Sequence, residues 1–198
     1  MRSKSMANFY LPMALSVLTM ALALSAAAQQ VNMTFSGTSG TSATNLQQPN
    51  TLSGEDDYAG TGTLGSFTFR LLEADPNSPT SSDTCNGANE IYLEVSTGGG
   101  AFRFQDGSLL YVQIMHGTDC IDLAVGPAGE ARCIRSLQIT GGTGRFKNVS
   151  LGTLLTLTET VVPVLADALG NPVFFAATGK ITGTVDGVSD GQGQGGGQ

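Results

Sequence analysis

The sequence predicts an all-β protein, folded as an antiparallel barrel of roughly eight strands. Beyond the N-terminal segment, polar and apolar residues alternate with a period of two from end to end, and no window shows a convincing period of 3.6. Clusters of Gly, Asn, Asp and Pro separate the alternating runs. A two-sheet sandwich fits the same pattern, but we favour the barrel because closure removes exposed sheet edges.

Each predicted strand has one apolar face, so that one side of the sheet meets a core and the other meets water. Phe67, Phe69 and Leu71 form one such face, while Arg70 lies on the opposite side. The predicted strands cover residues 31–36, 65–72, 90–96, 101–105, 109–115, 120–125, 132–140, 151–161 and 173–185.

The chain divides into four parts: a signal peptide (1–28), an N-terminal strand with a polar loop (29–59), the barrel core (60–185) and a disordered Gly/Gln-rich tail (186–198). Arg2 and Lys4 precede an uncharged run from Phe9 to Leu24, which is typical of a secretory signal. At about 16 residues the run is shorter than the ~20 that a membrane span needs. We therefore expect a secreted or periplasmic protein with no membrane span in the mature chain.

The net charge of the chain limits the kinds of binding partner that we expect. Without residues 1–28 the chain keeps seven basic and sixteen acidic residues, a formal charge of −9. This field repels a phosphate backbone, so nucleic acid and anionic membrane surfaces are poor partners.

Three cysteines in an exported chain allow one disulfide and leave one thiol. Cys120 and Cys133 flank a predicted hairpin and would be cross-strand neighbours. Strand alternation, however, places Cys120 on a polar face and Cys133 on an apolar one. Cys85 lies in a turn-like segment and could pair with either, so the pairing stays open.

Two glycine-rich segments resemble phosphate-binding loops. Residues 60–65 match G-x-G-x-x-G, but an acidic run precedes them and a strand pattern follows, so we reject a dinucleotide site. The segment ITGGTGRFKN (139–148) lacks a glycine-lysine-hydroxyl ending and leads into another strand. We interpret it as a sharp barrel corner, in which Phe146 closes one end of the core.

A family resemblance rests on the same segment. The run ITGGTGRFKNVSLGTLLTLTET, followed by FFAATGKITGTV, resembles the C-terminal half of small barrels of the allene oxide cyclase and dirigent type. It is also similar to uncharacterised exported bacterial proteins with a GGTGRF turn. The resemblance extends more loosely to GTGTLGSFTF and FRFQDGSLL. It implies an eight-stranded barrel whose relatives bind small apolar or aromatic molecules, with Gly141, Gly142, Gly144 and Phe146 as a structural turn.

No catalytic constellation accompanies these features, and we predict no cofactor and no metal site. His116 is the only histidine, in a predicted turn, which rules out multi-histidine metal sites. The acidic run Glu55-Asp56-Asp57 lies in a predicted polar loop and is interpreted as solvated.

Two charged residues are anomalous. By alternation Arg135 shares the face of Leu137, and Glu159 shares that of Leu157, which would direct opposite charges at the core. The simpler interpretation, which we favour, is that a bulge or the strand ends return both to solvent. They are nevertheless the leading candidates for lining a ligand pocket.

The candidate pocket comprises Arg135, Glu159, Phe102, Phe104 and Phe175. We expect the barrel to bind a small apolar or aromatic molecule, or to act at the cell envelope, without catalysis. The alternatives are a cyclase or dirigent-like enzyme or guide protein that uses the barrel cavity, and a structural or adhesive module. The sequence predicts neither the ligand nor the oligomeric state.

Overall fold

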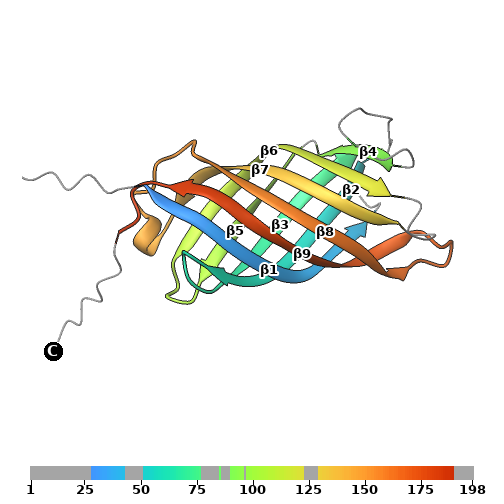
Figure 1. Ribbon diagram of the computed structural model, residues 1–198, viewed down its shortest axis with the longest axis horizontal. Helices are drawn as coiled ribbons and strands as arrows, with labels where there is room; N and C mark the ends of the chain where they lie inside the picture. The colour runs from blue at the N-terminus through green and yellow to red at the C-terminus, as the bar shows by residue number, and fades with distance from the viewer. Residues whose placement is uncertain are drawn as a thin grey trace, which may run out of the picture.

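Nine strands lie within the described part of the chain (Figure 1). The computed structural model describes residues 28–42, 51–76, 85, 90–95, 97–122 and 129–189. Among them there is no α-helix, and the single helical turn is the 3-10 turn η2 (Gly144–Phe146). The strands are β1 (Gln29–Ser42), β2 (Thr51–Gly62), β3 (Phe67–Pro76), β4 (Glu90–Val95), β5 (Thr97–Phe104), β6 (Leu109–Asp122), β7 (Glu130–Gly142), β8 (Leu154–Ala166) and β9 (Pro172–Val185).

Eight of these strands close an antiparallel barrel. They pair in the order β6-β5-β3-β2-β1-β9-β8-β7, and an additional pairing of β7 with β6 completes the ring. The ninth strand, β4, pairs with the C-terminal part of β6, whereas β5 pairs with the N-terminal part of β6. Closure confirms the barrel and excludes the two-sheet sandwich.

The polar N-terminal segment contributes more strand than its composition predicts. The predicted strand ended at residue 36, but β1 continues to Ser42, and β2 begins at Thr51 within the segment that was predicted as a polar loop. β1 is hydrogen-bonded to both β2 and β9. These two ladders hold a Gly/Ser/Thr segment in the sheet despite its weak strand propensity, which is context-dependent. The remainder of the predicted loop, residues 43–50, lies outside the described residues.

The segments predicted as separate strands, 109–115 and 120–125, prove to be one. β6 runs continuously through His116, which is therefore in a strand and not in a turn. A register shift between Ile114 and His116 marks a bulge in its pairing with β7. Because a bulge adds one residue, the inward face passes from Ile114 to Gly117 and then to Asp119. Residues 123–125 lie outside the described part.

The segment ITGGTGRFKN joins the end of β7 to η2 at one end of the barrel, on the left in Figure 1. Gly144 has a φ of +60°, which favours glycine. A Cβ on Gly142 would lie 2.6 Å from the Cβ of Phe146, so glycine permits a close approach. Phe146 itself is fully buried.

The first residues of the predicted C-terminal tail pack against the barrel. The start of the predicted tail lies against η2, where the Ser189 amide donates to the Arg145 carbonyl at 2.9 Å and Val188 packs on the core. Residues 190–198 lie outside the described residues, as do residues 1–27 of the predicted signal peptide.

Candidate functional site

Arg135 lies inside the barrel, contrary to the interpretation that a bulge or a strand end returns it to solvent. It sits on β7, it is 2% exposed, and its cross-strand partner on β6 is Gly117. A Cβ on Gly117 would lie 2.7 Å from the Cδ of Arg135. Glycine at this position therefore provides the space through which the arginine side chain runs.

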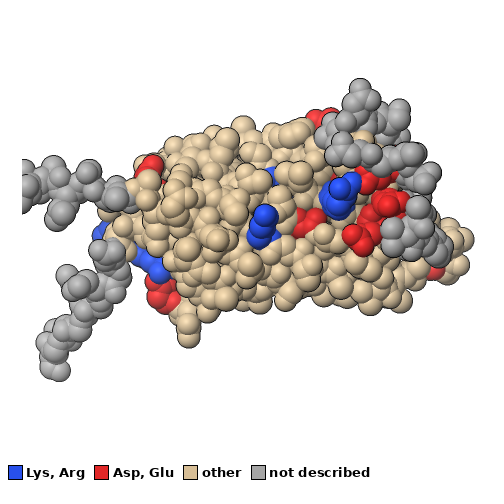
Figure 2. All heavy atoms as spheres, viewed as in Figure 1, with Lys and Arg blue, Asp and Glu red and all other residues tan. Residues whose placement is uncertain are grey.

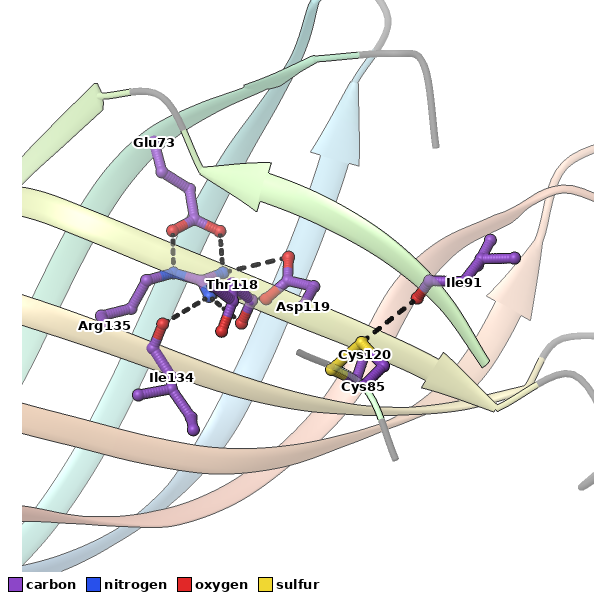
Figure 3. Close-up of polar contacts among 8 residues, drawn as sticks. All are labelled: Glu73, Cys85, Ile91, Thr118, Asp119, Cys120, Ile134 and Arg135. Atoms are coloured by element: carbon purple, nitrogen blue, oxygen red, sulfur yellow. Dashed lines mark hydrogen bonds and ion pairs between the residues drawn. A yellow bond between two sulfur atoms is a disulfide. The ribbon is translucent and has the colours of Figure 1, made fainter. Parts of the chain in front are cut away.

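Two carboxylates hold the guanidinium of Arg135 (Figure 3). Glu73 on β3 accepts from Nε at 2.8 Å and from Nη2 at 2.9 Å. Asp119 on β6 accepts from Nη1 at 2.5 Å and from Nη2 at 3.2 Å. Burial alone would lower the pKa of Arg135, but the charges of Glu73 and Asp119 raise it well above its usual value. The result is a buried cation with two bidentate partners.

A second group of polar side chains, Asp56, Tyr58 and Glu159, enters the same part of the interior. Glu159 on β8 is 7% exposed, so this residue too points inward. Asp56 and Tyr58 on β2 are buried as well, which corrects the interpretation of the acidic run 55–57 as solvated. Their neighbours Glu55 and Asp57 are on the outer face, where both pair with Arg70. The run belongs to a strand, and alternation divides it between the two faces.

Three buried atoms in this second group make no hydrogen bond of standard geometry, although Tyr58 lies close enough to Asp56 and Glu159 to interact with both: Asp56 Oδ2, Tyr58 Oη and Glu159 Oε2. Burial raises the pKa of Asp56 to about 7, and the nearby charge of Glu73 acts in the same direction. Burial also raises the pKa of Glu159 to about 8, with a further contribution from Asp56. The pKa of Tyr58 is raised by burial and then by Glu159. All three groups are therefore mainly uncharged below about pH 7.

Asp75 completes the cluster at the end of β3. It is 6% exposed, and its Oδ1 atom has no partner. Burial raises the pKa of Asp75 to about 8, as do the charges of Glu73 and Asp119. We call the interior residues Asp56, Tyr58, Glu73, Asp75, Asp119, Arg135 and Glu159 the acidic half of the barrel. On the surface, Figure 2 shows most of the Asp and Glu residues of this face towards the right-hand end of the molecule, where β6 ends in Figure 1.

Aromatic rings fill the other half of the interior. Phe69 and Phe102, which are cross-strand partners, stack with centroids 4.0 Å apart. Phe104 packs on Phe146 at 4.8 Å, and the guanidinium of Arg145 lies 4.7 Å from the Phe104 centroid. The apolar half is defined by seven buried residues, which are Phe67, Phe69, Leu71, Phe102, Phe104, Leu110 and Phe146.

The structure divides the five predicted pocket residues between the two halves. Arg135 and Glu159 belong to the acidic half, and half-buried Phe175 pairs with Ser39, the neighbour of Asp56 on the adjacent strand. Phe102 and Phe104 instead pack among the rings of the apolar half. Sequence reasoning did not single out Tyr58, Glu73, Asp75 or Asp119 as site residues, although Glu73 and Asp75 continue the inward alternation of Phe67, Phe69 and Leu71.

The disulfide joins Cys85 to Cys120, and Cys133 is a buried free thiol. The register pairs Cys120 with Arg132 and Cys133 with Asp119, so the two hairpin cysteines lie on opposite faces of the wall. Pairing Cys120 with Cys133 is therefore wrong, for the reason that the alternation indicated. Burial raises the pKa of the Cys133 thiol, which disfavours the reactive thiolate.

A groove of about 580 Å³ crosses the outer wall of the barrel. Its floor includes a row of side chains that the register aligns across five strands: Thr34, Lys180, Thr158, Ile134 and Thr118. Glu159 also borders the groove, but its side chain is buried. The groove and the acidic half are thus largely separated by the barrel wall, and the ionisable cluster, not the groove, is our candidate site.

No family model matches the chain, and no curated protein matches it. Among solved structures, the chain is similar to the pterocarpan synthase dirigent protein GePTS1 at 14% identity and a TM-score of 0.34. The match covers 89% of this chain and 99% of that chain. The described residues include no helix long and apolar enough to span a membrane.

Proposed function

We propose that this protein is an exported barrel that binds a small, uncharged molecule with an apolar or aromatic body in the acidic half, without converting it. The observation that carries the proposal is a cluster of three buried polar atoms that face one another without a hydrogen bond of standard geometry: Asp56 Oδ2, Tyr58 Oη and Glu159 Oε2. A buried polar group without a partner costs about 1–3 kcal/mol. A ligand that hydrogen-bonds to these atoms removes that cost.

The protonation of the site favours an uncharged ligand with a carbonyl or hydroxyl group. With pKa values raised to about 7 and about 8, the carboxyls of Asp56 and Glu159 are largely protonated in mild acid and donate hydrogen bonds. A carboxylate ligand would add a further negative charge beside Glu73 and Asp119. The electrostatic cost therefore discriminates against anions.

Aromatic contacts support an apolar body for the ligand. The Tyr58 ring stacks on Phe35 with centroids 4.6 Å apart and lies 6.3 Å from Phe69. Tyr58 thus links the rings of the apolar half to the polar atoms of the acidic half. Sites of this kind combine an apolar surface with a few oriented polar groups.

Export is supported by the disulfide. Cys85 and Cys120 are joined, and such bonds persist mainly in oxidising compartments. The predicted signal peptide over residues 1–28 is consistent with the same localisation.

The first test is a native mass spectrum of the full chain, expressed with its N-terminal segment and purified from the secreted fraction. We expect a reproducible adduct of a few hundred daltons, the size that an eight-stranded interior admits. A bare mass under gentle conditions would contradict the proposal and favour a solid, structural barrel.

A second test uses acetophenone as an uncharged aromatic carbonyl probe and benzoate as its anionic counterpart, with saturation-transfer NMR at pH 6. We expect acetophenone to bind at least tenfold more tightly than benzoate. Tyr58→Phe should weaken acetophenone binding about fivefold, since it deletes only the hydroxyl. The matched control is Tyr111→Phe, on the exposed outer face, which should bind as the parent does. Equal binding by both variants would remove Tyr58 from the site.

A second candidate function is conversion of the bound molecule, as in a cyclase or a dirigent-like guide protein. It is favoured by the pKa values of Asp56 and Glu159, which lie in the range of a general acid. The two candidates differ in one measurement: the mass and chirality of the recovered ligand are unchanged for a binding protein and changed for an enzyme or guide.

A further inference from the structure

We propose that Glu73, Asp75 and Asp119 form a binding site for a calcium-type divalent cation inside the acidic half. The proposal is independent of the proposed ligand-binding function, because it concerns β3 and β6 and not the Asp56, Tyr58 and Glu159 group. One oxygen from each of the three residues lies within 4.8 Å of the others. A Ca²⁺ ion binds oxygens at about 2.4 Å, so two oxygens on opposite sides of the ion lie about 4.8 Å apart. One Ca²⁺ can therefore reach all three residues.

Two of the three proposed ligand residues are held in place by the buried Arg135 side chain. The guanidinium of Arg135 fixes Glu73 and Asp119 through four hydrogen bonds of 2.5–3.2 Å. Each carboxylate oxygen that accepts one such bond retains a second lone pair. Arg135 therefore orients two ligand residues without using up their capacity to bind a cation.

Asp75 supplies the observation that points to a ligand. Its Oδ1 atom is buried and has no hydrogen-bond partner, and one oxygen of the same carboxylate lies within 4.8 Å of oxygens of Glu73 and Asp119. The charge of Arg135 offsets part of the cost of burying this carboxylate, but its hydrogen bonds to carboxylates go to Glu73 and Asp119. A cation that bridges Asp75 to the other two carboxylates supplies the missing partner.

The charge of the cluster matches a divalent ion. When all three carboxylates are ionised, they and the Arg135 guanidinium sum to −2, which Ca²⁺ neutralises, so the cation competes with a proton at Asp75. The ligand set consists of oxygen only, the type that hard cations prefer, and we favour Ca²⁺ over Mg²⁺ because Ca²⁺ accepts irregular coordination whereas Mg²⁺ demands a near-ideal octahedron. The other candidate group, Cys85, Glu90 and Cys120, contains the disulfide and lacks free thiolates.

The sequence does not reveal this site because its residues are far apart and lack a loop motif. Glu73 and Asp75 come from one strand, and Asp119 comes from another, brought inward by the β6 bulge. The tertiary register alone places them together.

The test measures thermal unfolding and Tb³⁺ luminescence of the full secreted chain at pH 7.5 after treatment with EDTA. We expect CaCl2 to raise the Tm saturably by several degrees, beyond any effect of NaCl at equal ionic strength. Tb³⁺, a surrogate for Ca²⁺, should give tyrosine-sensitised emission that Ca²⁺ displaces. Absence of a calcium-dependent shift at 10 mM would overturn the proposal and leave protons as the only neutralising species.

Substitutions distinguish Ca²⁺ binding at a specific site from non-specific screening of the negative charge of the protein. Asp75→Asn should weaken Ca²⁺ binding at least tenfold, and Asp75→Ala is measured in parallel so that the result does not depend on the folding of one variant. The control is Asp57→Asn, whose side chain is 65% exposed on the outer face and should leave Ca²⁺ binding unchanged. An equal calcium response in the Asp75 variants and the parent would place the cation elsewhere.

Discussion

The two halves of the barrel interior share strands but are stabilised by different interactions. β3 illustrates the change, because its inward residues are Phe67, Phe69 and Leu71 in the apolar half, followed by Glu73 and Asp75 in the acidic half. The rings are stabilised by burial and stacking, which tolerate approximate geometry. The ionic groups depend on paired charges and on protonation. Apolar packing therefore accounts for the barrel, whereas the acidic half is the part of the interior for which we propose a binding role.

The largest difference between the halves should follow from Arg135→Ala. It leaves the carboxylates of Glu73 and Asp119 buried without their cation, which we expect to cost about 5 kcal/mol. The measurement is urea unfolding at pH 7.5, with exposed Arg103→Ala as the control. A loss no greater than that of the control would show that the buried ion pairs do not contribute to stability.

Phe102→Ala gives the corresponding result for the apolar half. It removes a fully buried ring that stacks on Phe69, and we expect a loss of about 4 kcal/mol through burial and cavity terms. Unlike the Arg135 variant, it should leave the proposed ligand and cation sites functional. Loss of acetophenone or Ca²⁺ binding in a folded Phe102→Ala protein would break the separation of the two halves.

The pH dependence of stability should come from the acidic half. Asp56, at about 7, and Glu159, at about 8, have pKa values raised in the folded state above the ordinary values of 3.8 and 4.5. Between these limits the folded state binds more protons than the unfolded state, so stability falls as pH rises from about 4 to about 8. The groups that face them are Tyr58, Glu73 and Arg135.

We expect a loss of about 3 kcal/mol between pH 5 and pH 8, less than the full slope of about 1.4 kcal/mol per pH unit and group, because local relaxation screens the charges. Urea unfolding in EDTA at several pH values measures it. The double variant Asp56→Asn/Glu159→Gln should make the profile shallower but not flat, because Asp75, with a pKa raised to about 8, titrates in the same range. Phe102→Ala should shift the whole profile without changing its slope. Unchanged slope in the double variant would assign the titration to other groups.

The smallest effect tests the space that glycine provides for Arg135. In Gly117→Ala the new Cβ would lie 2.7 Å from Arg135 Cδ and from Val95 Cβ, so we expect about 2 kcal/mol of destabilisation. Gly40→Ala is the matched control, since its Cβ would meet nothing closer than 3.8 Å. If both variants unfold at the same urea concentration, a glycine at position 117 is not needed for Arg135 to reach Glu73 and Asp119.

The alternation in the sequence was informative about the walls of the barrel and less so about its interior chemistry. It identified the inward faces around Phe69 and Phe102, and it placed Cys120 and Cys133 on opposite faces, as the register confirms. It also directed Arg135 and Glu159 at the core. The simpler interpretation returned them to solvent, because the sequence shows no partners for a buried arginine.

β2 and β6 show why the remainder could not be predicted. The segment around Asp56 and Tyr58 has the glycine and acid content of a loop, and its pairing with β1 and β3 makes it a strand. The bulge at His116 then changes which residues of β6 face inward. Neither feature has a local signal, since both arise from hydrogen bonds to strands that are distant in the chain.

By itself, the sequence determined that this is an all-β chain with one apolar face per strand, because the period of alternation is a local property of the backbone. It also determined that one cysteine pair was available and that the chain is strongly acidic. Only the tertiary structure decided that the pair is Cys85 with Cys120, and that Arg135 meets Glu73 and Asp119. Strand register across a closed barrel sets these contacts, and register depends on every strand at once.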